Sequence, residues 1–554
     1  MDSKTKMKVN VLAIICIIVF SFVLAPKTLQ NDTFYTIKIG EHIVENGLDR
    51  EDPFAWSDLK YTYPHWLYDV AVYEVYNMTG MTGIYISTAL LACILGILVF
   101  VTSLKVNKNN LFSFILTLAV MYFIKDFIAA RAQLVTFIFF VLEILFVECF
   151  LASKKKRYII GLAFIACLIA NMHSAVFYVF FVLLLPYFAE YLLIFIRDTN
   201  FIYKLRIKSL KSKIEKMAKK GKSQEKIEEV QIKLEKVEEA SLKFIENQKR
   251  REEKPYKIRL ERRDAVKWLI ICTIIFFAMG LLTPLGDEPY THIFKLLHGK
   301  TTNSISEHQP LILKGHTGMI MVLVMTFGIL VFTDTKISLK DLFMIGGLTI
   351  LTFSARRQFS LLVLIGGFSI SRLICELVDK YDNTGTEEFT RLMISWKGKI
   401  ITIILLVLCS FNLYKTKIKD EYISKTSYPV ELADFMLEEK EKGNLNFDTM
   451  KMYNDYNYGS YLLFRDIPVF IDSRADLYSP EFNEECKIFE DYMDISNIST
   501  YYEDKFKDYE ITHVVTYSNS KLNMLLVRDE NYKELYKDKY FTLYERLSDN
   551  DKNA

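Results

Sequence analysis

LQNDTFYTIKIGEHIVENGLDREDPFAWSDLKYTYPHWLYD, residues Leu29–Asp69, is polar, acidic and aromatic, and it follows directly on an apolar run at Val9–Ala25. That run has the length and composition of a first membrane span. A minimal connector would not carry so many ionisable side chains, which are Asp32, Glu41, His42, Asp49, Glu51, Asp52, His65 and Asp69. We therefore interpret this stretch as the active-site loop of a membrane enzyme. The rest of the chain would position this loop or supply further residues to the site.

The composition predicts a polytopic α-helical membrane protein. The chain has 554 residues, of which 51% are hydrophobic and 14% aromatic, with a mean hydropathy of +0.16. Several apolar runs reach the roughly 18–20 residues that cross about 30 Å of hydrocarbon. Counting Val9–Ala25 as an uncleaved span, we predict about eleven spans. The others are Ile84–Leu104, Leu111–Phe127, Leu134–Ala152, Ile159–Ala170, Ala175–Ile196, Val266–Leu282, Met319–Phe332, Leu342–Phe353, Leu361–Leu377 and Ile400–Leu413.

The basic residues set the orientation of these spans. The start, MDSKTKMK, predicts a cytoplasmic N-terminus, and alternation then places the C-terminal tail outside the cell (plasma) membrane. The predicted domains are an N-terminal membrane region at 1–196 with an external catalytic loop at 26–83, a cytoplasmic coiled-coil hairpin insertion at 197–264, a second membrane region at 265–415 and an extracytoplasmic α/β domain at 416–554.

The insertion at 197–264 is basic, with 22 Lys and Arg against 13 Asp and Glu. Two runs of apolar residues at helical spacing predict a coiled-coil hairpin with its turn at Gly221. These runs are Ile207, Leu210, Ile214 and Met217, then Ile227, Val230, Leu234, Val237 and Phe244. Three interpretations stay open, namely contact with anionic membrane lipids, docking of a cytoplasmic partner, and a solvated hairpin that only joins two spans.

The tail alternates strand-length apolar runs with helix-like stretches, which favours a small α/β domain. The predicted strands are Thr449–Tyr453, Pro468–Asp472, Ile511–Tyr517 and Tyr540–Tyr544. The eight cysteines form no disulfide framework and no CxxC metal motif. The net charge of +3 gives no indication of a nucleic-acid partner.

The predicted topology places many polar residues at span ends on the external side. Carboxylates come from the first loop, whereas Arg131, Arg356 and Arg357 come from later loops. A carboxylate can act as a general base, and arginines bind phosphate oxygens with two parallel hydrogen bonds. This pair of functions suits a glycosyl phosphate donor in the outer leaflet. For any single residue, an interfacial anchor is the plainer interpretation.

In this order of elements, the chain resembles the GT-C superfamily of integral-membrane glycosyltransferases. Within that superfamily it is similar to the bacterial and archaeal set described as dolichyl-phosphate-mannose mannosyltransferase-like. The matching stretches are NDTFYTIKIGEHIVENG (Asn31–Gly47), DPFAWS (Asp52–Ser57), PHWLYD (Pro64–Asp69), RAQL (Arg131–Leu134), NMHS (Asn171–Ser174), SEHQP (Ser306–Pro310) and YGSYLLFRDIPVFIDSRADLY (Tyr458–Tyr478). They span nearly the whole chain except the hairpin.

The resemblance implies an inverting transfer from a polyprenyl-phosphate-linked sugar to an envelope acceptor outside the membrane. It places Asp32 as the base, with Asp52 as a second carboxylate. Where the family often has a pair of acidic residues, this chain has Asn31 before Asp32 and Thr33 after it. A divalent metal ion therefore stays an open question, and no other cofactor is implied.

The remaining candidates are assigned to ligand binding. Arg131, Arg356 and Arg357 are expected to bind the donor phosphate. The sugar or acceptor is expected to contact His65, Trp66, Gln133, Asn171, His173 and Glu307. In the tail, Asp472, Arg474 and Asp476 follow a predicted strand, where they either recognise the acceptor or form an ionic network that docks the domain.

Two other function classes stay open. A catalytically silent GT-C-like scaffold of envelope assembly is favoured slightly by the missing acidic pair. A lipid or solute transporter would be expected to have charged residues in mid-span, or broken helices related by an internal repeat, and neither is evident. The identity of the sugar and of the acceptor is not encoded in any motif that we recognise.

Overall fold

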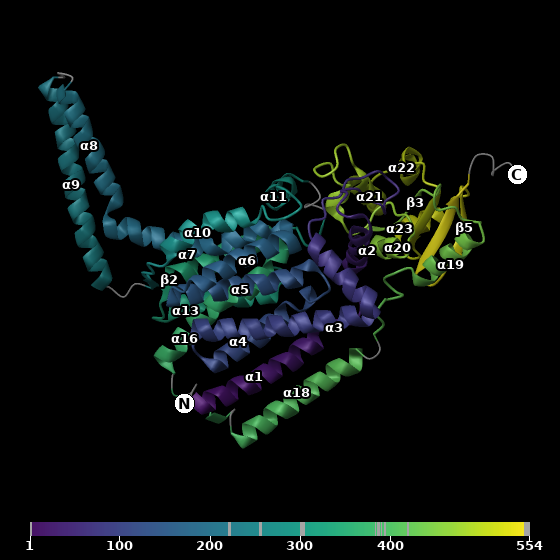
Figure 1. Ribbon diagram of the computed structural model, residues 1–554, viewed down its shortest axis with the longest axis horizontal. Coiled ribbons are helices and arrows are strands. Elements are labelled where there is room, and N and C mark those ends of the chain that lie inside the picture. Colours follow the sequence, from purple (N-terminus) through teal and green to yellow (C-terminus); the bar gives the residue numbers. More distant parts are fainter. Residues whose placement is uncertain are drawn as a thin grey trace.

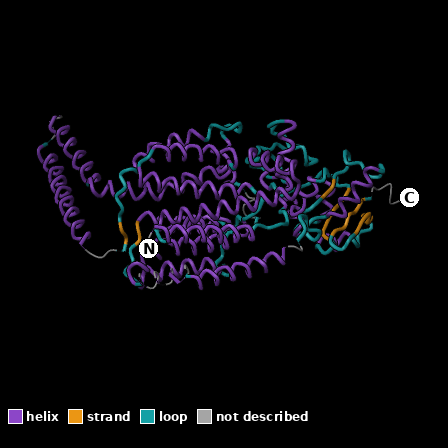
Figure 2. Tube along the Cα trace, turned by 60° about the horizontal axis from the view of Figure 1, so that its bottom comes forward, coloured by secondary structure: helices purple, strands orange, loops and turns teal. Residues whose placement is uncertain are grey.

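The computed structural model describes residues 3–219, 223–253, 257–299, 305–382, 384, 388, 391–392, 395–417 and 420–547. A bundle of roughly parallel and antiparallel helices forms its centre (Figure 1). A long helical hairpin projects from one end of the bundle, and an α/β domain lies at the other (Figures 1 and 2). We refer to these as the hairpin end and the domain end.

Five helical segments are long and apolar enough to cross a membrane, so the chain is compatible with a helical membrane protein. They are Met7–Leu24 of α1 (Ser3–Leu24), α3 (Trp66–Asn107), α5 (Ala132–Ser153), Ser174–Thr199 with η2 (Ser174–Val176) and α7 (Phe177–Thr199), and Arg356–Tyr381 with η3 (Arg356–Gln358), α15 (Phe359–Leu361), η4 (Leu362–Gly366) and α16 (Gly367–Tyr381). Shorter apolar helices are α4 (Asn110–Phe123), α10 (Val266–Met279) and α13 (Thr317–Phe332).

The other predicted spans lie in α6 (Lys156–Met172), α14 (Leu339–Ser354) and α18 (Trp396–Lys417). The total of about eleven spans stays a prediction, because only five described segments meet the length and composition expected of a span.

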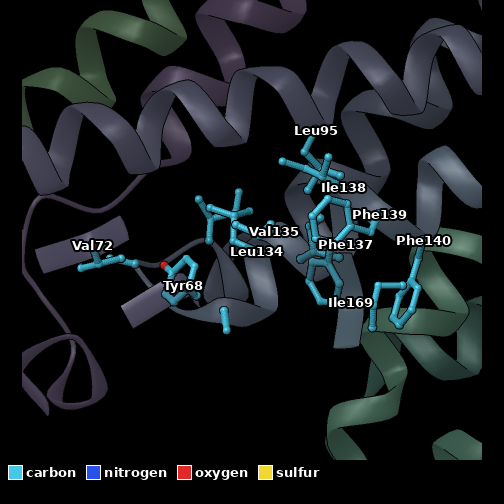
Figure 3. Close-up of a cluster of buried hydrophobic side chains, with 14 of the residues drawn as sticks. Tyr68, Val72, Leu95, Leu134, Val135, Phe137, Ile138, Phe139, Phe140 and Ile169 are labelled. Carbon is cyan, nitrogen blue, oxygen red and sulfur yellow. The ribbon is translucent and has the colours of Figure 1, made fainter. Parts of the chain in front are cut away.

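Helix α5 forms the centre of the bundle. Its residues from Leu134 to Val141 are all buried, as expected for a helix that is apolar on every side. In Figure 3, Phe137, Ile138 and Phe139 lie near Leu95 of α3 and Ile169 of α6. The position of α5 is therefore fixed by packing along most of its length.

The hairpin consists of α8 (Phe201–Lys219) and α9 (Gln224–Glu253), which run antiparallel. The rings of Tyr203 and Phe244 lie tilted against each other with centroids 5.4 Å apart, and Lys211 Nζ lies 3.0 Å from a carboxylate oxygen of Glu238. The predicted turn at Gly221 lies outside the described residues. After α9 the chain returns through β1 (Ile258–Arg259), which pairs in parallel with β2 (Ile337–Ser338).

The hairpin end of the bundle contains a connected group of ion pairs, which we call the hairpin-end network. Its anchor is Glu148 of α5, whose carboxylate oxygens lie 2.9 Å from Lys340 Nζ and 3.0 Å from Arg263 Nη1. Eight ion pairs connect four carboxylates with four cations, which are Glu148, Glu261, Asp341 and Glu376, and Arg259, Arg263, Lys340 and Arg372.

The domain after residue 420 contains a four-stranded sheet in the order β3-β4-β6-β5. The strands are β3 (Met452–Tyr453), β4 (His513–Tyr517), β5 (Tyr532–Lys537) and β6 (Phe541–Arg546), and only the β3–β4 pair is parallel. Helices of this domain are α19 (Val430–Glu441), α20 (Tyr456–Phe464), η5 (Ala475–Tyr478), α21 (Ile488–Asn497), α22 (Tyr502–Asp508) and α23 (Lys521–Leu526).

The predicted strand at Pro468–Asp472 does not join this sheet. Val469, Phe470 and Ile471 are buried, but the ladder is limited to a single parallel bridge between Val469 and Ala55 of the first loop. The apolar run therefore serves as a docking surface for that loop. Its composition is the same as that of a buried strand, so the sequence could not distinguish the two.

The first loop, predicted as an external loop with no secondary structure assigned to it, begins with a helix, α2 (Asn31–Asn46). Phe34 and Ile37 belong to the main hydrophobic cluster, Ile39 and Ile43 belong to a second one, and the helix packs between α3 and α20. Gly40 permits the close approach to α3, because a Cβ at this position would lie 2.2 Å from the backbone oxygen of Asp69. The loop after α2 then lies against the C-terminal domain, where Trp56 Nε1 donates to Met452 O over 3.1 Å.

Candidate functional site

A cavity of about 710 Å³ lies where the domain end of the bundle meets the C-terminal domain. Its volume is in the range of small-molecule and cofactor sites. The walls come from α2, the start of α5, the residues around η2 and η3, α11 (Glu288–His298), and the starts of α20 and α21. Segments more than 400 residues apart in the chain thus meet at one cavity.

The cavity has a polar part and an apolar part. Phe137 and Phe140 of α5, beyond the first turn of that helix, line it together with Val176, Val179 and Leu361. The polar residues are contributed mainly by helix starts and by the loops at the domain end. A ligand with a charged head and an apolar chain would match both parts.

Asp32 and Arg131 form an ion pair on the wall of the cavity. Asp32 lies in the first turn of α2, and Arg131 directly precedes α5. Arg131 Nε donates to Oδ2 of Asp32 over 2.6 Å, and a second guanidinium nitrogen contacts the same oxygen. This pairing raises the pKa of Arg131, with burial opposing the shift. Arg131 is therefore a fixed cation at the mouth of the apolar part.

Arg357 supplies a second cation, and its partner is neutral. Its Nη1 donates to Nε2 of His308 over 2.7 Å. Burial, together with the charge of Arg357, lowers the pKa of His308 to about 4. The neighbouring Arg356 does not line the cavity and donates instead to Oγ of Ser306 over 3.1 Å. The two consecutive arginines therefore have different surroundings.

Two further histidines face the cavity near α2. His65 Nδ1 lies 2.7 and 2.8 Å from the two carboxylate oxygens of Asp69, which is fully buried. His65 Nε2 lies 3.4 Å from the hydroxyl of Tyr35. His173 Nδ1 lies 2.9 Å from Oγ1 of Thr136, and burial, followed by the nearby His65 and Arg357, lowers its pKa well below the usual range.

His292 of α11 joins the bundle side to the C-terminal domain. Its Nδ1 lies 2.8 Å from Glu288 and its Nε2 lies 3.7 Å from Asp476. Burial alone would lower the pKa of His292, but the two carboxylates raise it to about 9. His292 is therefore protonated at neutral pH and holds Asp476 at the rim of the cavity.

Arg474 is buried between two carboxylates. Its Nη1 donates to Asp52 over 2.6 Å, its Nη2 donates to Asp472 over 2.6 Å, and Tyr478 donates to the same Asp472 over 2.6 Å. The guanidinium also lies 4.9 Å from the ring centroid of Tyr61. These contacts attach the first loop to the C-terminal domain, which matches the docking interpretation of this group.

The structure brings together most, but not all, of the predicted site residues. Those that line the cavity are Asp32, His65, Arg131, Gln133, His173, Glu307, Arg357, Arg474 and Asp476. Five lie outside its lining, which are Asp52, Trp66, Asn171, Arg356 and Asp472. Asp52 and Asp472 hold Arg474, and the amide nitrogen of Asn171 donates to the backbone oxygens of Cys167 and Leu282, each over 2.9 Å.

Several cavity residues were not assigned to the site from sequence. They include Tyr35 and Thr36 of α2, Lys60, His292, His308 and Tyr456. The spacing of Asp32 and Tyr35 places both on one face of a helix, but only if α2 is recognised as a helix. Among the described residues, no group of three or more His, Cys, Asp or Glu side chains is arranged to hold a metal ion.

The sequence matches no protein-family model and no curated protein.

Proposed function

We propose that the protein transfers a sugar from a polyprenyl-phosphate carrier to an acceptor hydroxyl at the external face of the membrane. The observation that carries this proposal is the shape and chemistry of the cavity. Arg131 and Arg357 line its polar part, and an apolar part continues between α5, α7 and α15. A polyprenyl phosphate combines an anionic head with an apolar chain, so both parts have a matching partner.

The two arginines are suited to the leaving group. When the bond between the anomeric carbon and the phosphate oxygen breaks, the phosphate gains negative charge and needs cations rather than a general acid. Arg357 faces neutral His308, so its charge is available to an anion. Arg131 can keep its hydrogen bonds to Asp32 from one edge of its guanidinium and donate to a phosphate oxygen from the other.

The acceptor hydroxyl needs a base within about 3 Å. The first external loop supplies two groups on the cavity wall, the carboxylate of Asp32 and the imidazole of His65. The acceptor itself would enter from the C-terminal-domain side, which contributes Tyr456, Ser473 and Asp476 to the wall.

For the orientation, we infer that the hairpin end faces the cytoplasm. The segment 197–264 has 22 Lys and Arg against 13 Asp and Glu, and basic segments are retained on the cytoplasmic side. The cavity would then lie at the external surface. Labelling of single cysteines introduced at Lys211 and Lys442 tests this. We expect an impermeant reagent to reach only Lys442→Cys in intact cells.

Ligand binding by the purified full chain tests the donor assignment. We expect a polyprenyl phosphate to raise the apparent Tm, and the matched polyprenol to have much less effect. At a ligand concentration of about 100 Kd the stabilisation is about 2.7 kcal/mol. Arg131→Ala should abolish the difference between the two ligands. Equal stabilisation by the phosphate and the alcohol would contradict a phosphate-binding role.

A genetic comparison tests the transfer itself. We expect a deletion strain to lack one envelope glycan, which wild-type protein restores and Asp32→Asn or Arg131→Ala does not. A full set of envelope glycans in the deletion strain would favour the alternatives of a silent scaffold or a transporter. So would complete restoration by Arg131→Ala at wild-type expression.

A further inference from the structure

His65 and Asp69 form a hydrogen-bonded pair, and the buried carboxylate determines which ring nitrogen of His65 carries the proton. Asp69 has no exposed surface, and its two oxygens lie 2.7 and 2.8 Å from Nδ1 of His65. The hydroxyl of Thr36, from α2, also hydrogen-bonds to this carboxylate. A carboxylate that accepts at Nδ1 keeps the proton on that nitrogen, so the lone pair of the neutral imidazole is on Nε2.

The backbone around His65 is held in one conformation. Tyr63 has φ of +50°, in the left-handed region, and its hydroxyl donates to Asp49 over 2.7 Å and to Glu51 O over 2.8 Å. Ser174 donates to Pro64 O from its backbone nitrogen over 2.8 Å and from its hydroxyl over 2.9 Å. The imidazole is therefore fixed on both sides before any ligand enters.

His65 lines the cavity, and its Nε2 is the ring nitrogen that Asp69 does not hold. The nearest polar contact of Nε2 is the hydroxyl of Tyr35 at 3.4 Å, a long hydrogen bond that an acceptor hydroxyl would replace. Burial, and then the nearby Asp32, raise the pKa of Tyr35 well above its usual range, so this phenol stays a neutral donor. Asp32 differs from His65, because its carboxylate is bound by Arg131.

We propose that His65, aligned by Asp69, takes the proton from the acceptor hydroxyl, while Asp32 holds Arg131 in place for the phosphate. This inference rests on the proposed glycosyl transfer. The acceptor oxygen forms a bond to the anomeric carbon as its proton moves to Nε2 of His65. The bond from that carbon to the phosphate oxygen breaks, and the electron pair leaves with the lipid phosphate, which Arg131 and Arg357 stabilise. The imidazolium is stabilised by Asp69, a positioning residue.

Several charged or titratable groups face this pair and belong to its pH dependence. The ring of His173 lies edge-on to His65 at 6.2 Å, and its depressed pKa keeps it neutral. The charge of Arg474 acts on Asp69, and the charges of Asp32 and Arg131 act on Tyr35. Arginine stays charged over the accessible pH range, so neither Arg474 nor Arg131 adds a titration of its own.

The test uses the purified full chain, a polyprenyl-phosphate hexose with a radiolabelled sugar, and membranes of the deletion strain as the source of acceptor. We expect His65→Gln to lower the transfer rate by about 100-fold or more, in line with the loss of a general base. Asp69→Asn should lower it by about 10-fold or more. Binding of polyprenyl phosphate should stay within about twofold of wild type in both variants. His513→Gln, in the C-terminal sheet, is the matched control.

Two readouts distinguish a base from a structural contact. The pH profile of the transfer rate should differ between the wild type and His65→Gln, because only the wild type carries the proposed base. Added imidazole should restore part of the activity of His65→Gly. A His65→Gln protein with the wild-type rate, or one that loses activity together with phosphate binding, would overturn the assignment. A wild-type protein that transfers no sugar would instead overturn the proposed function, before any variant is made.

Discussion

The two ends of helix α5 hold charged groups in opposite situations. Glu148, near the last turns, belongs to the hairpin-end network, and Arg131 and Gln133 at the start belong to the cavity. From Gln133 to Glu148 the helix rises by roughly 22 Å. One rigid helix thus carries both groups. Their different surroundings, paired charges at one end and a cavity at the other, therefore come from the neighbouring elements and not from flexibility of α5.

In the hairpin-end network, each carboxylate lies within 4 Å of a cation, and the four charges of each sign balance. At the cavity, Arg357 faces a neutral histidine, and Arg131, although paired with Asp32, lines open volume. Charges that satisfy one another hold the helices together, whereas a charge left beside open volume is available to a ligand. We expect substitutions at one end to change stability and substitutions at the other to change binding.

The largest effect is expected from Lys340→Ala in the hairpin-end network. Lys340 is buried, lies 2.9 Å from Glu148 and 3.3 Å from Asp341, and its ammonium is 4.9 Å from the ring centroid of Tyr187. Removing one partner leaves buried carboxylates undercompensated, at a cost of about 3–5 kcal/mol. Thermal unfolding of the detergent-purified protein measures this loss.

An exposed lysine provides the control for that measurement. Lys233 of α9 pairs with Glu229 over 2.7 Å, but both side chains are exposed, so Lys233→Ala should leave the Tm nearly unchanged. Polyprenyl phosphate affinity of the folded fraction should match wild type in both variants. If Lys340→Ala weakened ligand binding without lowering the Tm, the division of roles between the two ends would be wrong.

The next effect concerns the two consecutive arginines at the domain end. Arg357→Ala removes a cation from the cavity wall, and we expect polyprenyl phosphate affinity to fall about 10- to 100-fold, since hydrogen bonds to charged groups contribute about 1.5–3 kcal/mol. Arg356→Ala removes the same charge one residue away, where the side chain donates to Ser306. Its affinity should stay within about twofold of wild type. Equal losses would mean that only the net charge of this end matters.

The predictions that succeeded depended on local patterns. Apolar runs such as Leu134–Ala152 have the periodicity and length of buried helices, and α5 occupies almost that range. By contrast, Asp52 and Arg474 are separated by 422 positions in the chain, and no local rule pairs them. Asp52 stays a predicted second carboxylate from the resemblance, and in the structure it accepts a hydrogen bond from Arg474 outside the cavity lining.

Two local signals were present and were interpreted differently. Phe34 and Ile37 have i, i+3 spacing and Ile39 and Ile43 have i, i+4 spacing, as expected of a helix, which the many charges of the stretch obscured. His65 and Asp69 have i, i+4 spacing, which brings side chains together only if a helix begins near residue 66. At Pro468–Asp472 the error is the opposite one, since a strand was predicted where the structure has a single bridge. Strand-like composition does not reveal whether a neighbouring strand is present to pair with.

A smaller effect is expected from pH at the junction between α11 and the C-terminal domain. Burial opposes protonation of His292, but Asp476 and Glu288 raise its pKa to about 9 from an unfolded value near 6.5. The stabilisation is fully present below pH 6.5 and is lost as the pH rises through 9. Because Asp476 is partly exposed, solvent screens this interaction, and we discount the stabilisation from protonated His292 to roughly 2 kcal/mol. The Tm should fall between pH 6.5 and pH 9.5, and His292→Gln should remove most of that change.

The smallest effects are expected from two amides that the sequence grouped together. Asn171 is held by two backbone oxygens outside the cavity, whereas Gln133 lines it. Asn171→Ala should therefore lower stability by about 1 kcal/mol and leave polyprenyl phosphate affinity unchanged. Gln133→Ala should leave the Tm unchanged and weaken binding about 2- to 10-fold, as expected for one neutral hydrogen bond. Both residues are at the domain end, but only Gln133 lines the cavity. Comparing the two variants therefore tests whether a residue must line the cavity to affect binding, or only lie near it. If both variants lost affinity equally, the whole end of the bundle would act as the binding unit, and the cavity wall would no longer account for which residues matter.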